Sequence, residues 1–447
     1  MKQFIGSLGI SAAWVSVSAY FALPWFSDIT NTLGVILAAL VVLGIALIPG
    51  FAMSFVYGTV LIDRRHKKTD IHTVREVEKV ADGITILVAA YNEQDTIHDT
   101  LGGICLASLN YTGPIEVIVC NDGSVDETAN RVTSFIASYK NTCEASRSLK
   151  LLNLPKNVGK STALNLGLKK ASHDIIVTVD ADTRLQPYSL QCIAHTLKNS
   201  DEDVAAVAGT VLVKNRRRSW ITRLQSWDYL IGISAVKHAQ SAYQYTLVAQ
   251  GAFSAYYKKV LEEVGGWPNK YGEDIVLSWK LLRAGYRITH DQNAIAFTSV
   301  PETYRTFFRQ RKRWSIGLIE SFKETPGILL NRDKGNVFVY YNALFPFLDL
   351  VFLFAFIPSV ILAIFFQYYL LVGVLTLLLI PLGATLIGVM YQRQRTIFKR
   401  NGMEMAGKNA SGLLLYVFLF QVLQVPATLT GYAVGLFNLK TTWGEKK

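Results

Sequence analysis

The N-terminal part of this 447-residue chain contains two long stretches without a charged residue, from Phe4 to Phe26 and from Ile29 to Ile62. A helix that crosses the hydrocarbon core of a membrane needs about 20 mostly apolar residues, so each stretch can cross once. A signal peptide is a poorer interpretation of the first stretch, because its apolar run is too long and a second one follows at once. We therefore predict two transmembrane helices over residues 1–62, with a very short turn at Asp28.

The C-terminal part repeats this pattern in three segments. Val337–Phe366 contains one charged residue, and neither Tyr368–Tyr391 nor Leu413–Asn438 contains any. We expect two to three transmembrane segments and a short tail over residues 337–447. If one segment does not cross, the one that contains Pro426 is expected to be re-entrant or interfacial.

Composition supports a membrane protein with a water-soluble part, placed at residues 63–336. Hydrophobic residues make up 51% of the chain and charged residues 17%, against roughly 25% charged residues in an ordinary soluble domain. This composition excludes a disordered chain and argues against a simple soluble enzyme.

The basic residues predict the orientation. The net charge is +12, from 45 Lys and Arg against 33 Asp and Glu. Clusters of Lys and Arg beside membrane spans stay on the cytoplasmic side, so residues 63–336 and the N-terminus are expected on that side of the cell (inner or plasma) membrane. The two clusters are Arg64, Arg65, Lys67 and Lys68, and Arg393, Arg395, Lys399 and Arg400.

The same charge bears on partners. Membrane lipids are expected partners, since basic residues are attracted to an anionic leaflet. Nucleic acid is not expected, because the charge lies beside the spans and no nucleic-acid motif is present. Three C-terminal spans would place Lys440, Lys446 and Lys447 outside, so the number of spans and the side of the C-terminus stay open.

The four cysteines do not predict a metal or disulfide framework. Their spacings match no zinc pattern, and a reducing compartment disfavours disulfides. We interpret them as buried small apolar residues. They are Cys105, Cys120, Cys143 and Cys192.

Residues 63–336 have an α/β pattern, in which apolar runs alternate with helical periodicity. This predicts βαβ units and a mostly parallel sheet covered on both faces. The expected strands are Ile84–Ala90, Ile115–Cys120, Leu149–Leu154, Asp174–Val179 and Val204–Val213. The expected helices are Glu93–Ser108, Asp126–Tyr139, Lys160–Ala171 and Pro187–Lys198, and Ser219–Gln240 also has roughly helical spacing.

Polar residues follow each of the first four strands. Ligands bind beyond the carboxyl ends of the strands in such sheets, so these residues are expected to share one site. Each segment alone is more often a turn or a helix cap. The segments are Tyr91-Asn92-Glu93, Asn121-Asp122-Gly123-Ser124, Lys156 to Ser161, and Asp180-Ala181-Asp182.

Two of these segments suggest phosphate and metal chemistry. Gly159-Lys160-Ser161 is not an ATP-binding loop, because that loop needs a glycine where Leu154 stands, but Lys160 remains a candidate contact for a diphosphate. Asp180 and Asp182 suit a hard cation, since Mg²⁺ takes one or two carboxylates together with substrate phosphates. Such a metal would neutralise charge on a departing diphosphate.

Five motifs in order resemble the processive, membrane-embedded family 2 glycosyltransferases, which polymerise sugars from nucleotide donors. The resemblance covers about residues 80–320. The Asn121 variant of the second motif and the segment Tyr271–Leu282 resemble the poly-β-1,6-N-acetylglucosamine synthase branch of these cellulose, hyaluronan and chitin synthase-like enzymes. The motifs are Val88 to Glu93, Asn121 to Ser124, Asp180-Ala181-Asp182, Gly272-Glu273-Asp274, and Gln310-Arg311-Lys312-Arg313-Trp314.

The resemblance implies a GT-A-like, Rossmann-type, mostly parallel sheet flanked by helices, beside an all-α transmembrane region. It implies Asp274 as the general base, with Glu273 beside it, and Asp182 as the ligand of Mg²⁺ or Mn²⁺. The implied donor contacts are Asn92, Glu93, Asp122, Lys160, Asp180 and Arg313, and the implied acceptor contacts are Gln310, Trp314 and Gly251.

The residue types suit these roles. Inversion in one displacement needs one base on the acceptor hydroxyl. An arginine fork suits a diphosphate, and an indole offers a flat platform to a sugar ring. The simpler interpretations are a helix cap for Glu273-Asp274 and a basic membrane-surface helix for Arg311 to Arg313.

We therefore expect an inverting, metal-dependent transferase that extends a polysaccharide from a UDP-sugar, with UDP-N-acetylglucosamine the first candidate, and passes the chain through the adjacent spans. The branch also implies a small membrane accessory protein and a role in biofilm matrix. Open alternatives are β-glucan, hyaluronan or chitin synthesis and glycolipid glycosylation. From other classes, a transporter with a degenerate nucleotide-binding domain and a sugar-binding module remain open.

Overall fold

The computed structural model describes residues 2–63, 77–140, 147–369, 374–400, 402 and 409–439. Three features of the sequence lie outside the described residues: the basic cluster at 64–68, Cys143, and the lysines at 440, 446 and 447.

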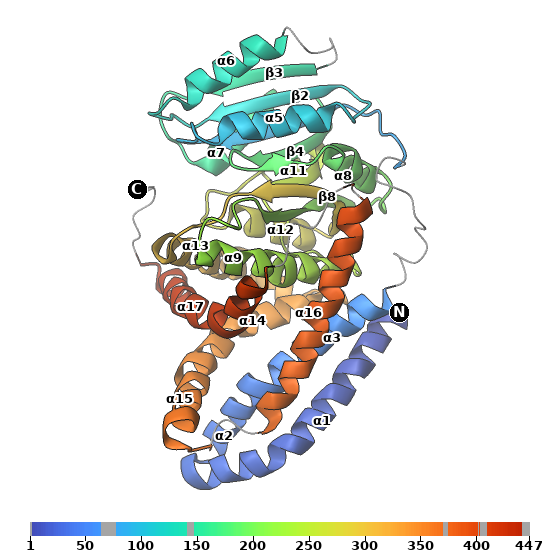
Figure 1. Cartoon of the computed structure of the whole chain (residues 1–447). Helices are drawn as coiled ribbons and strands as arrows, with labels where there is room; N and C mark the ends of the chain where they lie inside the picture. Colours follow the sequence, from blue (N-terminus) through green and yellow to red (C-terminus); the bar gives the residue numbers. More distant parts are fainter. Residues whose placement is uncertain are drawn as a thin grey trace.

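An eight-stranded mixed sheet forms the centre of the domain at the top of Figure 1, in the order β3-β2-β1-β4-β7-β6-β8-β5. Four of its strand pairs are parallel, β3 with β2, β2 with β1, β1 with β4, and β6 with β8. The prediction of a mostly parallel α/β sheet is therefore confirmed. The strands are β1 (Ile84–Ala90), β2 (Ile115–Asn121), β3 (Arg147–Asn153), β4 (Ile175–Asp180), β5 (Arg184–Leu185), β6 (Val204–Val213), β7 (Phe253–Tyr257) and β8 (Arg287–Thr298).

The strand β7 runs antiparallel between β4 and β6 and was not predicted from the sequence. Its five residues are too few to show a clear period. Because β7 begins where β4 ends, it places Gly251 beside the carboxyl end of β4, where the amide of Asp180 donates to the carbonyl oxygen of Ala252 over 3.4 Å.

Helices cover both faces of the sheet, as the apolar strands predict. Residues of α5, α6 and α8 form the core on one face, and residues of α7 and α12 form the core on the other. The second core continues into side chains of the membrane-side helices, including Phe55, Phe338 and Met390, so the two parts pack as one body. The helices are α5 (Ile97–Ser108), α6 (Thr128–Lys140), α7 (Lys160–Lys170), α8 (Ser189–Lys198), α11 (Lys258–Glu263) and α12 (Glu273–Arg283).

The helix α5 begins at Ile97 and not at the predicted Glu93. Two side chains between β2 and the first turn of α6 hold this segment. Ser124 and Thr128 accept from the amides of Asn92 and Glu93 at 2.9 and 2.8 Å. These amides are therefore bonded outside any helix.

The N-terminal helices reverse direction later than predicted. Helix α1 runs over Lys2–Leu33, so Asp28 lies inside it and not in a turn. The reversal occurs at Gly34, whose φ of 88° is a left-handed conformation that glycine adopts without steric cost. The return path is α2 (Val35–Val42), a π-helical turn, and α3 (Ile48–Ile62).

Among the described residues, four helices are long and apolar enough to cross a membrane: Lys2–Leu33, Val35–Ile62, Asn336–Phe366 and Ala410–Phe437. The third comprises α14 (Asn336–Val351), a π-helical turn and α15 (Ile357–Phe366). The predicted segment Tyr368–Tyr391 lies partly outside the described residues and continues in α16 (Val374–Arg400).

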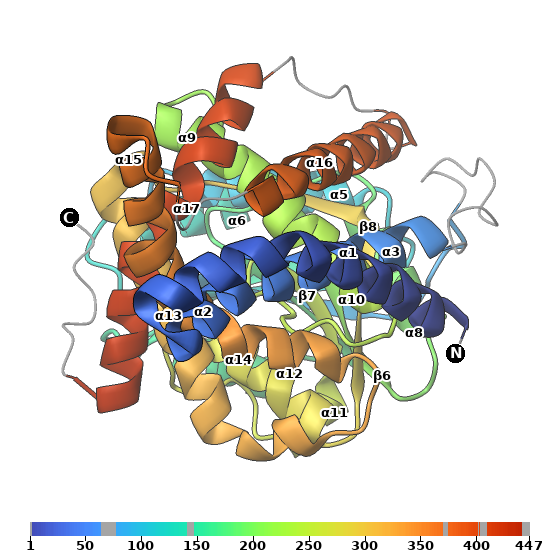
Figure 2. The same cartoon turned by 90° about the horizontal axis from the view of Figure 1, so that it is seen from below.

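The last of these helices, α17 (Ala410–Phe437), lies differently from the others. Helices α1 and α16 descend away from the sheet in Figure 1, whereas α17 stays close beneath α13 (Tyr304–Glu324) and extends across the view from below in Figure 2. The two helices contact each other along their length. The ammonium of Lys323 donates to the carbonyl oxygens of Gly435 and Leu436 at 2.6 and 3.1 Å.

The segment predicted as one helix over Ser219–Gln240 is three consecutive helical pieces. They are α9 (Trp220–Trp227), a π-helix over Asp228–Ala235, and α10 (Val236–Ser241). The hydroxyls of Ser219 and Thr222 form a reciprocal capping box at the start of α9. Wide turns of the π type inside helices are frequent at functional sites, and this one carries Asp228 and Tyr229.

Helix α13 approaches α12 backbone to backbone. A Cβ atom at Gly317 would lie 2.7 Å from the Cα atom of Gly272, which cannot yield as a side chain would. We expect Gly317→Ala to lower the free energy of unfolding by about 1–3 kcal/mol. Since α13 carries the Gln310–Trp314 motif, we also expect it to lower the activity that the motif resemblance implies. Thermal unfolding of the purified protein and product formation would measure both.

The matched control is Gly102→Ala. Gly102 lies inside α5, where a new Cβ atom meets nothing within 4 Å. Alanine also favours a helix over glycine, so this variant is expected to be as stable as the parent or slightly more stable. Equal behaviour of the two variants would contradict a tight α12–α13 contact.

Candidate active site

Lys160 joins three of the predicted site segments. Its ammonium lies 2.7 Å from Asp180 Oδ1 and 3.0 Å from Glu273 Oε1. Burial alone would lower the pKa of Lys160, but Asp180 and Glu273 raise it overall, so the side chain stays charged. A Cβ atom at Gly251 would lie 2.8 Å from this ammonium, so the glycine leaves the lysine room to reach both acids.

Asp274 is the second residue of α12 and lies beside this lysine cluster. Its carboxylate accepts from the amides of Ile275 at 2.8 Å and Gly251 at 3.4 Å. Burial raises the pKa of Asp274, and the adjacent Glu273 raises it further, while Lys160 acts in the opposite direction. A carboxylate with a raised pKa is better matched to accept a proton near neutral pH than an ordinary aspartate is.

Lys237 is a neighbour of Asp274 that the sequence analysis missed. It lies on α10, is buried, and donates to the side-chain oxygen of Gln250. Burial lowers the pKa of Lys237 to about 7, although the charge of Asp274 raises it.

Asp122 connects the loop after β2 to the loop before α7 by hydrogen bonds. It is only 3% exposed, and its carboxylate accepts from the amides of Val158 at 2.7 Å and Gly159 at 2.9 Å. The loop after β2 is thereby fixed against the loop that leads into Lys160.

Asn92 and Glu93 lie in the loop after β1, where they contact the segment that follows β2. Asn92 has a positive φ of 54°, and its side-chain oxygen accepts from the amide of Val125 at 3.0 Å. The carboxylate of Glu93 accepts from the hydroxyl of Thr96 at 2.7 Å. Both residues shape the sheet edge.

Asp182 is oriented by two hydroxyl groups. Its Oδ1 atom accepts from Thr298 at 3.0 Å and from Thr183 at 3.3 Å. Hydroxyls that orient a carboxylate in this way are typical outer-shell partners of a metal ligand. Among the described residues no group of three or more His, Cys, Asp or Glu is arranged to hold a metal ion, but a Mg²⁺ or Mn²⁺ ion that also binds substrate phosphates fits one or two carboxylates.

The Gln310–Trp314 motif lies on α13, and its members face different surroundings. Trp314 is 39% exposed, and its ring lies 6.5 Å from that of Tyr229. Arg313 is exposed, while the side-chain oxygen of Gln310 is buried and has no hydrogen-bond partner in the described part of the chain. Burial raises the pKa of Tyr229, so its hydroxyl stays protonated beside this motif.

Arg311, the second residue of that motif, does not lie on the membrane surface as the simpler interpretation predicts. It is buried, its guanidinium donates to Asp228 Oδ2 over 2.7 Å, and it stacks on Trp314 with 4.3 Å between the guanidinium carbon and the ring centroid. Asp228 comes from the π-helix, so this ion pair fixes α13 against the segment that carries Tyr229.

The buried cysteines match their prediction in part. Cys120 and Cys192 are buried, and Cys105 is half-buried. Burial raises the pKa of Cys120 to about 12, which makes its thiol unreactive.

Comparison with known proteins gives one matching family profile and several curated relatives. The profile of the family described as "Glycosyl transferase family group 2" matches residues 175–390. The chain is 35% identical over 253 residues to the poly-beta-1,6-N-acetyl-D-glucosamine synthase of Staphylococcus aureus (strain MSSA476), which covers 56% of this chain and 57% of the relative. The synthase of Staphylococcus epidermidis is 32% identical over 245 residues, covering 55% and 56%. The chain thus matches a little over half the length of these curated relatives.

Among solved structures, a mannosyltransferase from Pyrobaculum calidifontis in complex with GDP-Man and Mn²⁺ has the same fold. The TM-score is 0.54 at 19% sequence identity, and the match covers 85% of this chain and 98% of that one. This similarity concerns the fold, and it agrees with the GT-A-like sheet expected from the sequence.

Proposed function

We propose that the chain is an inverting, metal-dependent polysaccharide synthase that uses UDP-N-acetylglucosamine and forms poly-β-1,6-N-acetylglucosamine. The match of residues 175–390 to the profile of glycosyl transferase family group 2 supports this proposal. The observation that carries the proposal is the cluster in which Lys160 pairs with Asp180 and Glu273, directly beside Asp274. The curated relatives are synthases of this polymer.

In this proposal Asp274 takes the proton of the acceptor hydroxyl as that oxygen attacks the donor sugar. The raised pKa of Asp274 favours this role. Glu273 supports it twice, through its negative charge beside Asp274 and through its ion pair with Lys160.

The leaving diphosphate meets positive charge from two sides. Lys160 and the exposed Arg313 bind it, Asp180 orients Lys160, and Asp182 holds the Mg²⁺ or Mn²⁺ ion. When bound, the ion would neutralise charge on the departing diphosphate. Arginine suits this place, since its planar fork donates two hydrogen bonds to phosphate oxygens.

The remaining residues position the two substrates. Asp122, with Asn92 and Glu93, would form the edge that receives the uridine of the donor. Trp314 would stack on the acceptor sugar, Gln310 would donate or accept beside it, and Gly251 would leave space next to Lys160. Tyr229 joins this set, because its ring lies beside Trp314.

We further propose that residues 1–62 and the C-terminal region from 337 anchor the domain in the inner or plasma membrane, with residues 63–336 in the cytoplasm. The crosswise position of α17 favours an interfacial helix (Figures 1 and 2). With α17 at the interface, the crossings would be residues 2–33, 35–62 and 336–366, together with the predicted segment Tyr368–Tyr391 that continues in α16. The C-terminal lysines would then stay on the cytoplasmic side, which removes the conflict with the charge rule. The polymer would leave through the crossings, and a small accessory protein would assist.

The test uses the full chain in membranes, supplied in turn with each labelled UDP-sugar and with Mg²⁺ or Mn²⁺. We expect release of UDP and a labelled polymer with UDP-N-acetylglucosamine, loss of both with a chelator, and digestion of the polymer only by a β-1,6-specific hydrolase. Incorporation of another sugar would contradict the proposed donor, and digestion by another hydrolase would contradict the proposed linkage. No UDP release from any donor would favour a transporter or a sugar-binding module.

The charge of Lys237 gives a pH-dependent prediction. Burial and Glu273 raise the pKa of Asp274, whereas Lys160 and Lys237 lower it. Lys237 carries its charge only below its pKa of about 7. We expect Lys237→Met to raise the pKa of Asp274 and to move the acidic limb of the kcat/KM profile to higher pH, on the order of one unit. The profile from pH 5 to 9 measures this.

A control variant is Lys169→Met, since Lys169 is exposed on α7. Its profile should match that of the parent. If Lys237→Met lowered the rate equally at every pH, the lysine would have a structural role and the electrostatic prediction would be wrong.

A further inference from the structure

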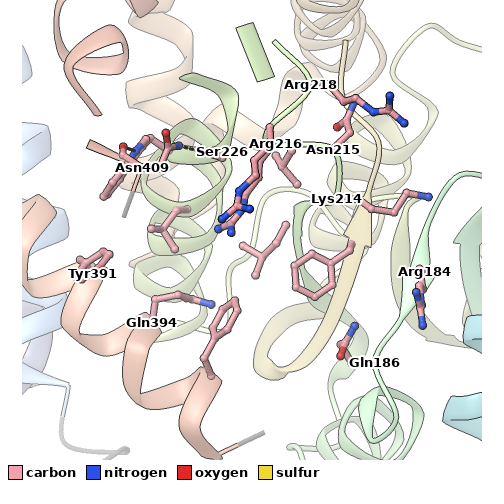
Figure 3. Close-up of a pocket in the computed structure, with 17 residues that line it drawn as sticks. Arg184, Gln186, Lys214, Asn215, Arg216, Arg218, Ser226, Tyr391, Gln394 and Asn409 are labelled. Carbon is pink, nitrogen blue, oxygen red and sulfur yellow. Dashed lines mark hydrogen bonds between the residues drawn. The ribbon is translucent and has the colours of Figure 1, made fainter. Parts of the chain in front are cut away.

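A cavity of about 810 Å³ lies apart from the proposed catalytic residues, between the β6–β8 edge of the sheet, α9 and α16. None of the described residues that line it belongs to the proposed active site. Figure 3 shows its two sides, with Tyr391 and Gln394 projecting from α16 and with Lys214 and Asn215 on the opposite side.

One part of the cavity wall is apolar. Four of the apolar side chains come from the sheet and the α9 segment, and two come from α16. Trp227 and Tyr391 stack across this boundary with ring centroids 5.9 Å apart. The apolar residues of this wall are Leu212, Trp227, Leu230, Phe297, Tyr391 and Phe398.

The rim of the cavity is strongly basic. Five cationic side chains line it, and no Asp or Glu is among the described lining residues: Arg184, Lys214, Arg216, Arg217 and Arg218. Arg184 and Lys214 share one nearby carboxylate, that of Asp99, at 3.5 and 3.0 Å. One shared carboxylate leaves an excess of positive charge at the rim. The guanidinium of Arg216 extends into the middle of the cavity in Figure 3.

The position of the cavity on α16 indicates what could fill it. Residues 374–390 of this helix are uncharged, and charged residues begin directly afterwards at Arg393 and Arg395. Tyr391, Gln394 and Phe398 line the cavity at this boundary between the uncharged and the charged part of α16. The cavity therefore lies at the end of the apolar part of α16, and its apolar wall and its basic rim are adjacent.

We propose that this cavity binds one anionic phospholipid, with its phosphate beside Arg216 and an acyl chain against the apolar wall. A free phosphate would pair only with the basic side chains of the rim. An uncharged lipid would contact only the apolar wall. The site is separate from the transfer reaction, so it stands whether or not the donor and product named above are right.

The test is photo-cross-linking of the full chain in phosphatidylcholine nanodiscs that contain a small share of phosphatidylglycerol with a photoactivatable acyl chain. We expect cross-links concentrated in peptides that cover residues 212–230 and 391–398. Unlabelled phosphatidylglycerol should remove them, whereas inorganic phosphate at the same concentration should not. Equal protection by inorganic phosphate would overturn the lipid as occupant.

Arg216→Glu is expected to lower this labelling on the order of tenfold, because a cation at an anionic membrane surface contributes about fivefold and the reversal adds repulsion. Arg216→Gln should give an intermediate loss and guards against a folding defect in the first variant. The matched control is Arg223→Glu, at an exposed position on α9 outside the cavity lining, and its labelling should stay within about twofold of the parent. Equal losses in Arg216→Glu and Arg223→Glu would overturn the site in favour of general surface attraction.

Discussion

Asp274→Asn is expected to lower the rate of UDP release by about 10²- to 10⁴-fold, the usual contribution of a general base, while the donor still binds. Asparagine has nearly the same shape, and its side-chain oxygen can still accept the shorter of the two bonds, that from the amide of Ile275, while the longer one from Gly251 to the other carboxylate oxygen is lost. It cannot take up the acceptor proton. Single-turnover kinetics would measure the chemical step, and calorimetric titration with the UDP-sugar would measure donor binding.

The control for this substitution is Asp174→Asn, since Asp174 is exposed just before β4, at the end of the sheet away from Asp180. Its turnover should equal that of the parent. Normal turnover of Asp274→Asn would mean that another group accepts the proton, whereas loss of donor binding would assign Asp274 to the donor pocket instead.

Asp228→Asn is expected to cause the largest loss of stability, about 3–5 kcal/mol, because it leaves the buried guanidinium of Arg311 without its counter-charge. Both side chains are almost fully buried, with 5% and 6% of their side-chain surface exposed. For a domain of this size the loss corresponds to a fall in Tm of roughly 6–20 °C. Thermal unfolding in detergent would measure it.

The exposed pair of Lys198 and Asp82 provides the comparison. Its ammonium and carboxylate lie 2.9 Å apart, but both side chains are more than 40% exposed. Pairs of this kind contribute about 0–1 kcal/mol, so Asp82→Asn should shift Tm by only a few degrees. The double variant Asp228→Asn with Arg311→Met should recover part of the loss, and a double variant as unstable as Asp228→Asn would argue against an electrostatic cause.

The fold was largely predictable from local patterns. All five expected strands exist within two residues of their predicted ends, because buried parallel strands are continuous apolar runs that stop at polar loops. The long β8, the short β5 and β7, the turn at Gly34 and the π-helix after Trp227 were not predicted. Each depends on long-range pairing or on a single backbone conformation, which periodicity does not record.

The candidate site was predictable where a motif directly follows a strand. Asp122, Asp180 and Lys160 could be found by their position at the strand ends, and Asp274 by its motif. Lys237, Asp228 and Tyr229 could not, since they belong to no motif and their facing partners come from distant parts of the chain. Tertiary packing alone brings Lys237 beside Asp274 and Asp228 beside Arg311.

Small residues on two sides of α13 have a mechanical consequence. On one side Gly317 touches Gly272 at the start of α12, and on the other Gly431 of α17 leaves no room for a Cβ atom, which would lie 2.4 Å from the carbonyl oxygen of Lys312. Backbones in direct contact transmit a displacement directly, because no flexible side chain between them can rearrange to absorb it. A tilt or sliding of α17 would therefore be passed through α13 to the start of α12, where Asp274 lies.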